Sequence, residues 1–245
     1  MNRTLMYGEG LFETILWQGR TRKLYRHYER LRSSAEFFSL ECPDFETFCR
    51  NIEQRTNGKK DIYVKVCLFS YGRHRYYEKS SRTSLVVYAY KHRKVSEPKS
   101  LCFSDIRRSS SDPLLRHKTT NYFLNVLVKR KALMEGFYDC IFLNEKDEIT
   151  ECTSANMILL FRNRLLTPYR EGGLLFGTSL QALMEKVDIR EERLRKDDIV
   201  KASSVFLMNS LIGVLPIYRV EDKVFNVDAE VLNHLRKVLW EDNSS

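Results

Sequence analysis

The stretch His117-Lys118-Thr119-Thr120-Asn121-Tyr122 places a lysine directly before an amphipathic helical pattern. Apolar side chains recur at roughly helical spacing from Phe123 to Leu133, and Gly136 is a suitable C-cap. Lys118 should therefore lie in a loop or first turn before this helix, where it can face a cleft. Most lysines are simply solvated, because a catalytic lysine needs a tuned pKa, so a chemical role for Lys118 depends on its neighbours.

Four strand-like segments follow, arranged as two hairpins. They are residues 141–143, 149–153, 156–161 and 165–168. The apolar run 156–161 predicts a strand that is buried on both faces. Glu151 lies inside the second segment. Because carboxylates are seldom buried unless they are paired, Glu151 either faces solvent at a sheet edge or has a partner.

A glycine-rich segment, residues 172–177, precedes the next predicted helix, and Thr178 and Ser179 stand at the start of that helix. The free backbone N–H groups of a helix N-terminus and the positive end of its dipole favour a phosphate. The alternative is that Thr178 and Ser179 are ordinary N-cap residues.

A further helix is predicted near the N-terminus. Its apolar face consists of Leu24, Tyr28, Leu31, Ala35 and Phe38. His27 and Arg30 flank this face at its edge. Arg30 can turn inward to an anion, or it can stay solvated with its stem over apolar surface.

In chain order, Arg30, Lys118, Glu151 and Thr178 form a constellation that resembles the class IV aminotransferases, the fold-type IV pyridoxal phosphate enzymes. The matching motifs run through nearly the whole chain. They are GEGLFET at 8–14, HYERL at 27–31, SA at 34–35, KTTNY at 118–122, TE at 150–151, SAN at 154–156, TP at 167–168, LFGTS at 175–179 and NSL at 209–211. The resemblance implies an α+β fold with the two-domain architecture of D-amino acid aminotransferases.

The candidate boundary between the two domains is the segment 107–114, which contains three serines and Pro113. It predicts an N-terminal domain at 1–106 and a C-terminal domain at 115–245 that carries the lysine. Ligand sites commonly lie at domain boundaries, so the cofactor is expected between the two parts.

The resemblance also implies roles for individual residues. Pyridoxal phosphate needs an amine that holds it covalently, an acid beside its pyridine nitrogen, and donors for its phosphate. Lys118 matches the amine and Glu151 matches the acid. Arg30, Thr178 and Ser179 match the phosphate donors.

Two further matches and two departures complete this comparison. Tyr122 matches the residue that reaches the ring hydroxyl, and Ser210 matches a hydroxyl on the phosphate side. Leu180 stands where the family usually has arginine, and Cys152 where glycine is common. The chain also starts almost at the GEGLFET motif, so the opening strands of the family are expected to be short or missing.

The KTTNY motif and the segment 209–216 look most like aminodeoxychorismate lyases. These enzymes release pyruvate from 4-amino-4-deoxychorismate and leave 4-aminobenzoate for folate synthesis. Branched-chain and D-amino acid aminotransferases are the alternatives. Arg73 and Arg75 end a strand-like run that begins near Ile62, so they can hold the two carboxylates of such a substrate, although a basic surface turn is the alternative.

Composition limits the class of protein. A chain of 245 residues is long enough to bury about 70 to 75% of its unfolded surface, so no disulfide or metal is needed. The six cysteines show no C-x-x-C pair, which favours reduced thiols, no zinc and a cytoplasmic location. No apolar run approaches the ~18 residues of a membrane helix, and the polar start lacks a signal peptide core.

The formal net charge of +9 gives a competing hypothesis, nucleic-acid binding. A nucleic-acid-binding protein usually concentrates its basic residues in a stripe with stacking aromatic residues. Here the basic residues are scattered among 32 acidic ones. The charge equally suits a small anionic amino substrate and an anionic cofactor, with no nucleic acid or membrane partner. The family resemblance implies a homodimer.

Overall fold

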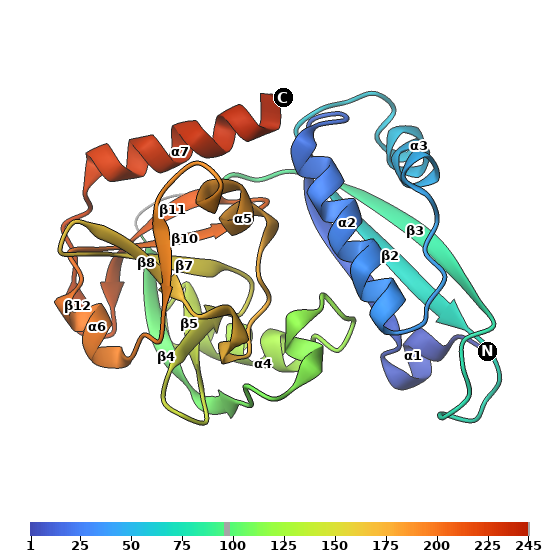
Figure 1. Cartoon of the computed structure of the whole chain (residues 1–245), viewed down its shortest axis with the longest axis horizontal. Coiled ribbons are helices and arrows are strands. Elements are labelled where there is room, and N and C mark those ends of the chain that lie inside the picture. Colours follow the sequence, from blue (N-terminus) through green and yellow to red (C-terminus); the bar gives the residue numbers. More distant parts are fainter. Residues whose placement is uncertain (96–98, 245) are drawn as a thin grey trace. The chain divides into compact units, whose positions relative to one another are not determined.

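The computed structural model describes residues 1–95 and 99–244 and divides into two compact units (Figure 1). Unit 1 comprises Met1–Arg93, His117–Tyr122 and the end of the chain. Unit 2 comprises Lys94–Arg116 and Phe123–Asp242. Both units mix helices and strands, which confirms the predicted α+β class.

Unit 1 is an antiparallel sheet of three strands with helices against one face. Its strand order is β1-β2-β3. Its elements are α1 (Arg3–Tyr7), β1 (Gly10–Trp17), α2 (Arg22–Phe37), α3 (Phe45–Thr56), β2 (Ile62–Tyr71) and β3 (Arg82–Lys91). The predicted N-terminal helix and the strand beginning near Ile62 are therefore confirmed.

The core of unit 1 lies between the sheet and the helices α2 and α3. Successive side chains of a strand point to opposite faces, so Leu11, Ile15 and Trp17 of β1 all face this core. The apolar residues predicted along α2 face it too, because a helix brings positions three and four apart onto one side. Thr21 caps α2 by accepting a hydrogen bond from the N–H of Leu24.

Unit 2 is built around a larger mixed sheet with the strand order β6-β5-β4-β11-β10-β7-β8-β9, and β12 pairs with β11. The strands are β4 (Lys99–Arg108), β5 (Asp139–Asn144), β6 (Ile149–Cys152), β7 (Asn156–Phe161), β8 (Arg164–Pro168), β9 (Ile189–Glu192), β10 (Ser204–Asn209), β11 (Gly213–Val220) and β12 (Lys223–Val224). The helices are η1 (Pro113–Arg116), α4 (Phe123–Met134), η2 (Arg170–Gly172), α5 (Thr178–Met184), α6 (Lys196–Lys201) and α7 (Ala229–Ser244). Both predicted hairpins, β5–β6 and β7–β8, are confirmed.

Strand β7 is buried on both faces, as its apolar run predicts. Met157 and Leu159 belong to one core cluster, whereas Ile158 and Leu160 belong to another that also includes residues of α5 and α7. This alternation follows from the two-residue period of a strand. Burial on both faces fixes β7 in the middle of unit 2, beside the segment that leads into α5.

The segment between the predicted domains is more ordered than a linker. Arg107 and Arg108, expected in the linker 107–114, are the last residues of β4, and η1 begins at Pro113. His117–Tyr122, which the sequence groups with the C-terminal part, clusters with unit 1 because it pairs with β1. The division into folding domains at 1–106 and 115–245 stays a prediction.

The sequence predicts that all six cysteines are reduced thiols. This prediction is wrong for two of them. Cys102 of β4 and Cys140 of β5 form a disulfide. They lie opposite each other in neighbouring parallel strands, with a Cα–Cα distance of 4.7 Å. Their separation of 38 residues leaves no local spacing signature, so only the strand register could reveal the pair. The free cysteines are Cys42, Cys49, Cys67 and Cys152.

Candidate active site

The segment that carries Lys118 lies along the start of β1 in unit 1. The N–H of Phe12 donates to the carbonyl of Lys118 at 2.9 Å, and the N–H of Thr120 donates to the carbonyl of Gly10 at 2.9 Å. The motifs at 8–14 and 118–122 are therefore side by side, although more than a hundred residues separate them. Helix α4 begins at Phe123, so the prediction that Lys118 lies just before a helix is confirmed.

Two glycines make this close approach possible. Gly8 has a positive φ of 70°, and a Cβ there would lie 2.1 Å from Oδ1 of Asn121. A Cβ at Gly10 would lie 2.5 Å from a methyl group of Thr4. A side chain at Gly8 would displace the amide of Asn121, and the positive φ there also favours glycine. A side chain at Gly10 would displace Thr4 and crowd Oγ1 of Thr120 at 3.1 Å.

The amine of Lys118 lies over aromatic rings. Its Nζ is 4.6 Å from the ring centroid of Phe12 and 5.6 Å from that of Tyr122. The two rings meet edge to face at 5.3 Å. Such a setting stabilises the ammonium form through the ring electrons and limits the water around it. The structure thus brings Lys118 and Tyr122 together beside Phe12, while their roles stay a prediction.

Arg30 is held by a buried carboxylate that sequence reasoning missed. Its Nε and Nη2 donate to the two oxygens of Glu13 at 2.8 and 2.7 Å. Nδ1 of His27 lies 2.6 Å from Oε2 of Glu13. Glu13 and His27 are both fully buried. The signal was present in the sequence, because a glutamate inside the apolar strand GLFETILW needs a partner.

The close contacts among Glu13, His27 and Arg30 change the pKa values of Glu13 and His27. Burial alone would raise the pKa of Glu13, but Arg30 and His27 outweigh it and lower that pKa to about 2. Burial lowers the pKa of His27, against the opposing influence of Glu13. The Glu13 carboxylate is therefore ionised at neutral pH. Nη1 of Arg30 is not used by Glu13 and can donate to an anion.

These shifts predict a loss of stability in acid. Glu13 titrates at about 2 instead of 4.5, so its contribution is present above pH 4.5 and is lost as the pH falls toward 2. His27, with a lowered pKa, adds to the loss below pH 6.5, because the unfolded chain takes up its proton first. The shift of Glu13 corresponds to about 3 kcal/mol. Denaturant titrations from pH 7 to pH 3 should show this fall, and a flat profile would contradict the assignment.

Glu151 also has a charged partner, Arg108, within unit 2. Nη1 of Arg108 lies 2.6 Å from Oε1 of Glu151, and the guanidinium lies 3.8 Å from the ring centroid of Phe142. The predicted placement of Glu151 inside a strand is confirmed, and of its two alternatives the paired carboxylate is correct. Sequence reasoning missed Arg108, which it placed only in the linker at 107–114.

The predicted phosphate-side hydroxyls gather at the start of α5. Oγ1 of Thr178 lies 3.4 Å from Oγ of Ser210. Oγ of Ser179 is buried and has no hydrogen-bond partner among the described residues. A buried hydroxyl without a partner is costly, so this oxygen fits a ligand that the chain itself does not supply. The phosphate of pyridoxal phosphate has the acceptor oxygens that such a hydroxyl needs.

The backbone before α5 is fixed by Asn156 of β7. The N–H of Gly177 donates to Oδ1 of Asn156 at 3.0 Å, and Nδ2 of Asn156 donates to the carbonyl of Leu175 at 2.8 Å. Gly177 itself is the N-cap and offers no side chain. Since Gly177 occupies the N-cap position, the alternative that Thr178 and Ser179 are N-caps is wrong.

The two departures from the family pattern lie in the core. Leu180 is 1% exposed and Cys152 is completely buried, each within an apolar cluster of unit 2.

Arg73 and Arg75 lie in the loop after β2, and both side chains are exposed in unit 1. Within the described ranges, no three His, Cys, Asp or Glu side chains gather as a metal site. No helix in those ranges is long and apolar enough to span a membrane.

Known proteins of the class IV aminotransferase family are similar to this chain along most of its length. The family model for amino-transferase class IV matches residues 10–220. A protein from Aquifex aeolicus assigned as a branched-chain-amino-acid aminotransferase is 23% identical, over 91% of this chain and 79% of its own. An aminodeoxychorismate lyase from Vibrio harveyi is 24% identical, over 88% of this chain and 84% of its own.

Solved structures share the fold along the whole chain. A structure from Legionella pneumophila assigned as a 4-amino-4-deoxychorismate lyase has a TM-score of 0.91 and 28% identity, and the match covers 98% of this chain and 93% of that one. A branched-chain aminotransferase from Thermoproteus uzoniensis, solved with norvaline, has a TM-score of 0.87 at 21% identity, over 99% of this chain and 88% of its own. Because the family model spans residues 10–220 and these folds agree, the chain belongs to the class IV aminotransferase family and is an enzyme of its lyase or aminotransferase branches.

Proposed function

We propose that this chain is a pyridoxal phosphate-dependent 4-amino-4-deoxychorismate lyase that yields 4-aminobenzoate and pyruvate. The observation that carries the proposal is the buried, unpartnered hydroxyl of Ser179 beside the Thr178–Ser210 pair, because it calls for an anion at the family's phosphate position. The lyase branch is supported by the likeness to the Legionella structure over 98% of the chain and by the two exposed arginines after β2.

The cofactor roles follow from the residues present. Lys118 would hold pyridoxal phosphate covalently, and Tyr122 would reach its ring hydroxyl. Glu151 would lie beside the pyridine nitrogen, where the ion pair with Arg108 orients its carboxylate. When bound, the cofactor supplies an electron sink for the carbon next to the substrate amine. The phosphate donors would be Arg30, Thr178, Ser179 and Ser210.

Lys118 would also move the proton. Its amine, once exchanged for that of the substrate, can remove the proton from the amine-bearing carbon. The rings of Phe12 and Tyr122 lie against this amine and limit the water around it. Release of pyruvate then leaves the aromatic ring of 4-aminobenzoate.

An aminotransferase for branched-chain or D-amino acids is the second candidate. It is favoured by the likeness to the Aquifex protein, and the same residues would hold the cofactor and move the substrate proton for that reaction. For either activity we expect a homodimer, a cytoplasmic location and a small anionic amino substrate.

One assay panel separates these two activities. The cofactor-loaded protein is incubated with aminodeoxychorismate, and separately with L-leucine and D-alanine, each with 2-oxoglutarate. We expect 4-aminobenzoate and pyruvate to form faster than any keto acid. Transamination of L-leucine or D-alanine without 4-aminobenzoate would move the protein to the aminotransferase branch.

The Glu151→Gln variant should keep the cofactor but lose most turnover, because an amide cannot balance the charge of a protonated pyridine. Loss of a charge-assisted hydrogen bond of about 1.5 to 3 kcal/mol corresponds to roughly a ten- to hundredfold lower kcat. A matched control is Glu148→Gln, which changes another buried glutamate of the β5–β6 hairpin, paired with Arg193. Equal turnover in Glu151→Gln and Glu148→Gln would contradict the proposal that Glu151 is the acid beside the pyridine nitrogen.

A further inference from the structure

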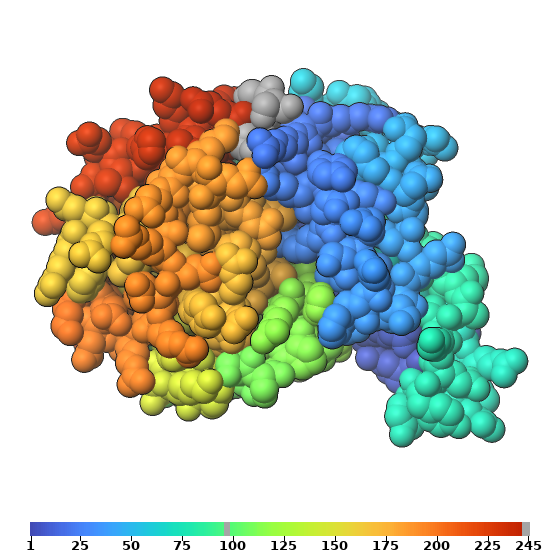
Figure 2. All heavy atoms as spheres, in the orientation of Figure 1, coloured from blue at the N-terminus to red at the C-terminus, as the bar shows by residue number. Residues whose placement is uncertain are grey.

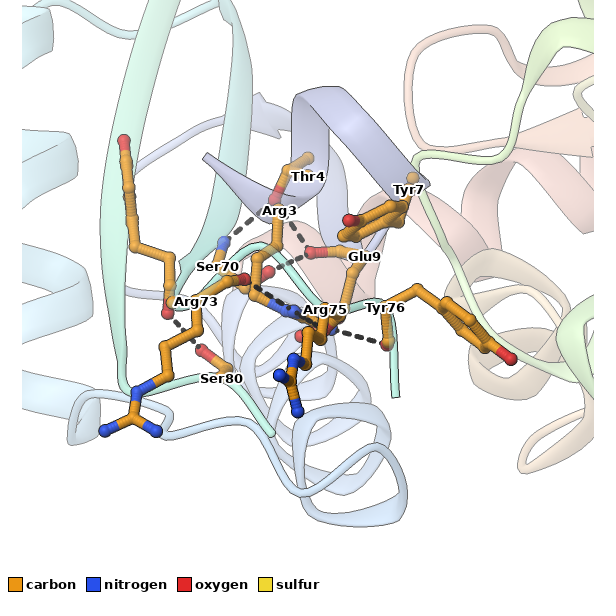
Figure 3. A network of polar contacts seen from close by, with 12 residues as sticks. Arg3, Thr4, Tyr7, Glu9, Ser70, Arg73, Arg75, Tyr76 and Ser80 are labelled. Carbon is orange, nitrogen blue, oxygen red and sulfur yellow. Dashed lines mark hydrogen bonds and ion pairs between the residues drawn. The ribbon is translucent and has the colours of Figure 1, made fainter. Parts of the chain in front are cut away.

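The loop after β2 has its backbone held by the N-terminal segment of unit 1. Four consecutive carbonyls, those of residues 73–76, accept hydrogen bonds from side chains of α1 (Figure 3). Arg3 donates to Arg73 at 3.0 Å, to Arg75 at 2.9 Å and to Tyr76 at 2.8 Å, and the hydroxyl of Tyr7 donates to His74.

Arg3 is the centre of this arrangement. A guanidinium has five N–H donors, and here each has an acceptor. Besides the three carbonyls, Nε and Nη2 contact Oε2 of Glu9 at 2.8 and 2.7 Å, so the charge is balanced. The residue is only 1% exposed. A group with no spare donor cannot also bind a ligand, so its effect must pass through the loop that it holds.

The neighbouring contacts make the arrangement rigid. The hydroxyl of Thr4 donates to the carbonyl of Glu9 at 2.7 Å and accepts from the N–H of Ser70 at 2.8 Å. A Cβ at Gly72 would lie 2.9 Å from Cδ of Arg3, so the chain passes close over the buried side chain. Moving the loop would strip partners from a buried cation, which is strongly unfavourable.

With the carbonyls turned inward, the side chains of the loop turn outward. The guanidinium groups of Arg73 and Arg75 point away from Arg3 (Figure 3). The side chain of Arg73 is 84% exposed and that of Tyr76 is 76% exposed. Residues near position 75, coloured teal, project from the surface of unit 1 (Figure 2). Arg73 lies 3.9 Å from Oε1 of Glu78, and Arg75 donates to the hydroxyl of Tyr77 at 3.1 Å. Both guanidinium groups thus stand at the surface of a loop whose backbone is already ordered.

We propose that Arg3 is a positioning residue that fixes the backbone of residues 73–76 so that Arg73 and Arg75 meet a substrate with two carboxylates without reordering. The inference rests on the proposed function for its substrate. Binding by a loop that is already ordered avoids the entropy cost of immobilising it, so the benefit should be seen in substrate affinity.

Limited proteolysis tests the structural half directly, because trypsin attacks the same carbonyls of Arg73 and Arg75 that Arg3 binds. The Arg3→Met variant should be cut after these residues about tenfold faster or more, relative to the bond after Arg162 in the exposed β7–β8 turn of unit 2. Arg3→Lys, with three donors, should be intermediate, and Tyr7→Phe should show a smaller increase. No increase, or an equal increase at Arg162, would overturn the proposal.

A control variant keeps the effect specific to Arg3. Arg20→Met removes another arginine of unit 1 that binds two carboxylates, those of Glu46 and Glu53, far along the chain from the loop. It should leave cleavage after Arg73 and Arg75 unchanged. Faster cleavage there in Arg20→Met would show that any loss of an ion pair loosens the loop.

Kinetics test the functional half. With aminodeoxychorismate, Arg3→Lys should raise KM about tenfold with little change in kcat or in the absorbance of bound cofactor. In the Arg73→Ala/Arg75→Ala background, Arg3→Lys should add no further rise in KM, because its effect passes through those side chains. An unchanged KM despite faster cleavage would overturn the proposal while the proposed function stands. If wild-type protein turns over none of the panel substrates, the proposed function fails, and cleavage still decides whether Arg3 holds the loop.

Discussion

Lys118→Ala should abolish turnover of every substrate in the panel, with kcat lower by at least about 10²- to 10⁴-fold, the usual contribution of a positioned general base. The variant loses both the covalent attachment of the cofactor and the base that moves the substrate proton. In wild-type protein, borohydride should fix pyridoxal phosphate on the peptide that contains Lys118. Peptide mass spectrometry and steady-state kinetics measure the two effects.

Lys65→Ala is a close control for this experiment. Nζ of Lys65 lies 4.4 Å from the ring centroid of Phe12, almost the same distance as Nζ of Lys118. The control therefore removes a similar cation–π contact on the same ring and keeps the proposed amine. We expect Lys65→Ala to retain the label on Lys118 and most of the turnover. Labelling of Lys65, or wild-type activity in Lys118→Ala, would refute the assignment.

Glu13→Gln should cost about 3 to 5 kcal/mol of unfolding free energy at pH 7, because removing one partner leaves a buried charge uncompensated. Glu13 is fully buried between Arg30 and His27, and an amide cannot accept two hydrogen bonds from Arg30 while balancing its charge. The acid-dependent part of the stability should shrink in the same variant. Denaturant titrations at pH 7 and pH 3 measure both effects.

The same substitution should weaken cofactor binding, since Arg30 would lose the contacts that fix its direction. Glu53→Gln is the matched control, because Glu53 also pairs with an arginine in unit 1 but lies at the surface. Exposed pairs contribute about 0 to 1 kcal/mol, so its effect should be small. Similar losses in Glu13→Gln and Glu53→Gln would mean that the buried ion pair has no special importance.

The sequence by itself determined the local elements and the chemical types in the site. Helix α4 after Lys118, the strand around Glu151, and α5 after Gly177 all follow from short-range periodicity and turn residues. These signals depend on neighbours a few positions away, so a single sequence contains them. The family resemblance then supplied the order of the candidate residues along the chain.

Only the tertiary structure decided the partners of those residues. Glu13 with Arg30, Glu151 with Arg108, and Arg3 with the loop at 73–76 are separated by 17, 43 and about 70 residues. The disulfide between Cys102 and Cys140 likewise joins residues that are far apart in the sequence, here by 38 positions. Each pairing is set by strand register and burial, because a buried charge or thiol meets whichever side chain the neighbouring element places opposite it. That choice depends on the packing of whole elements, for which no short stretch of sequence carries a signal.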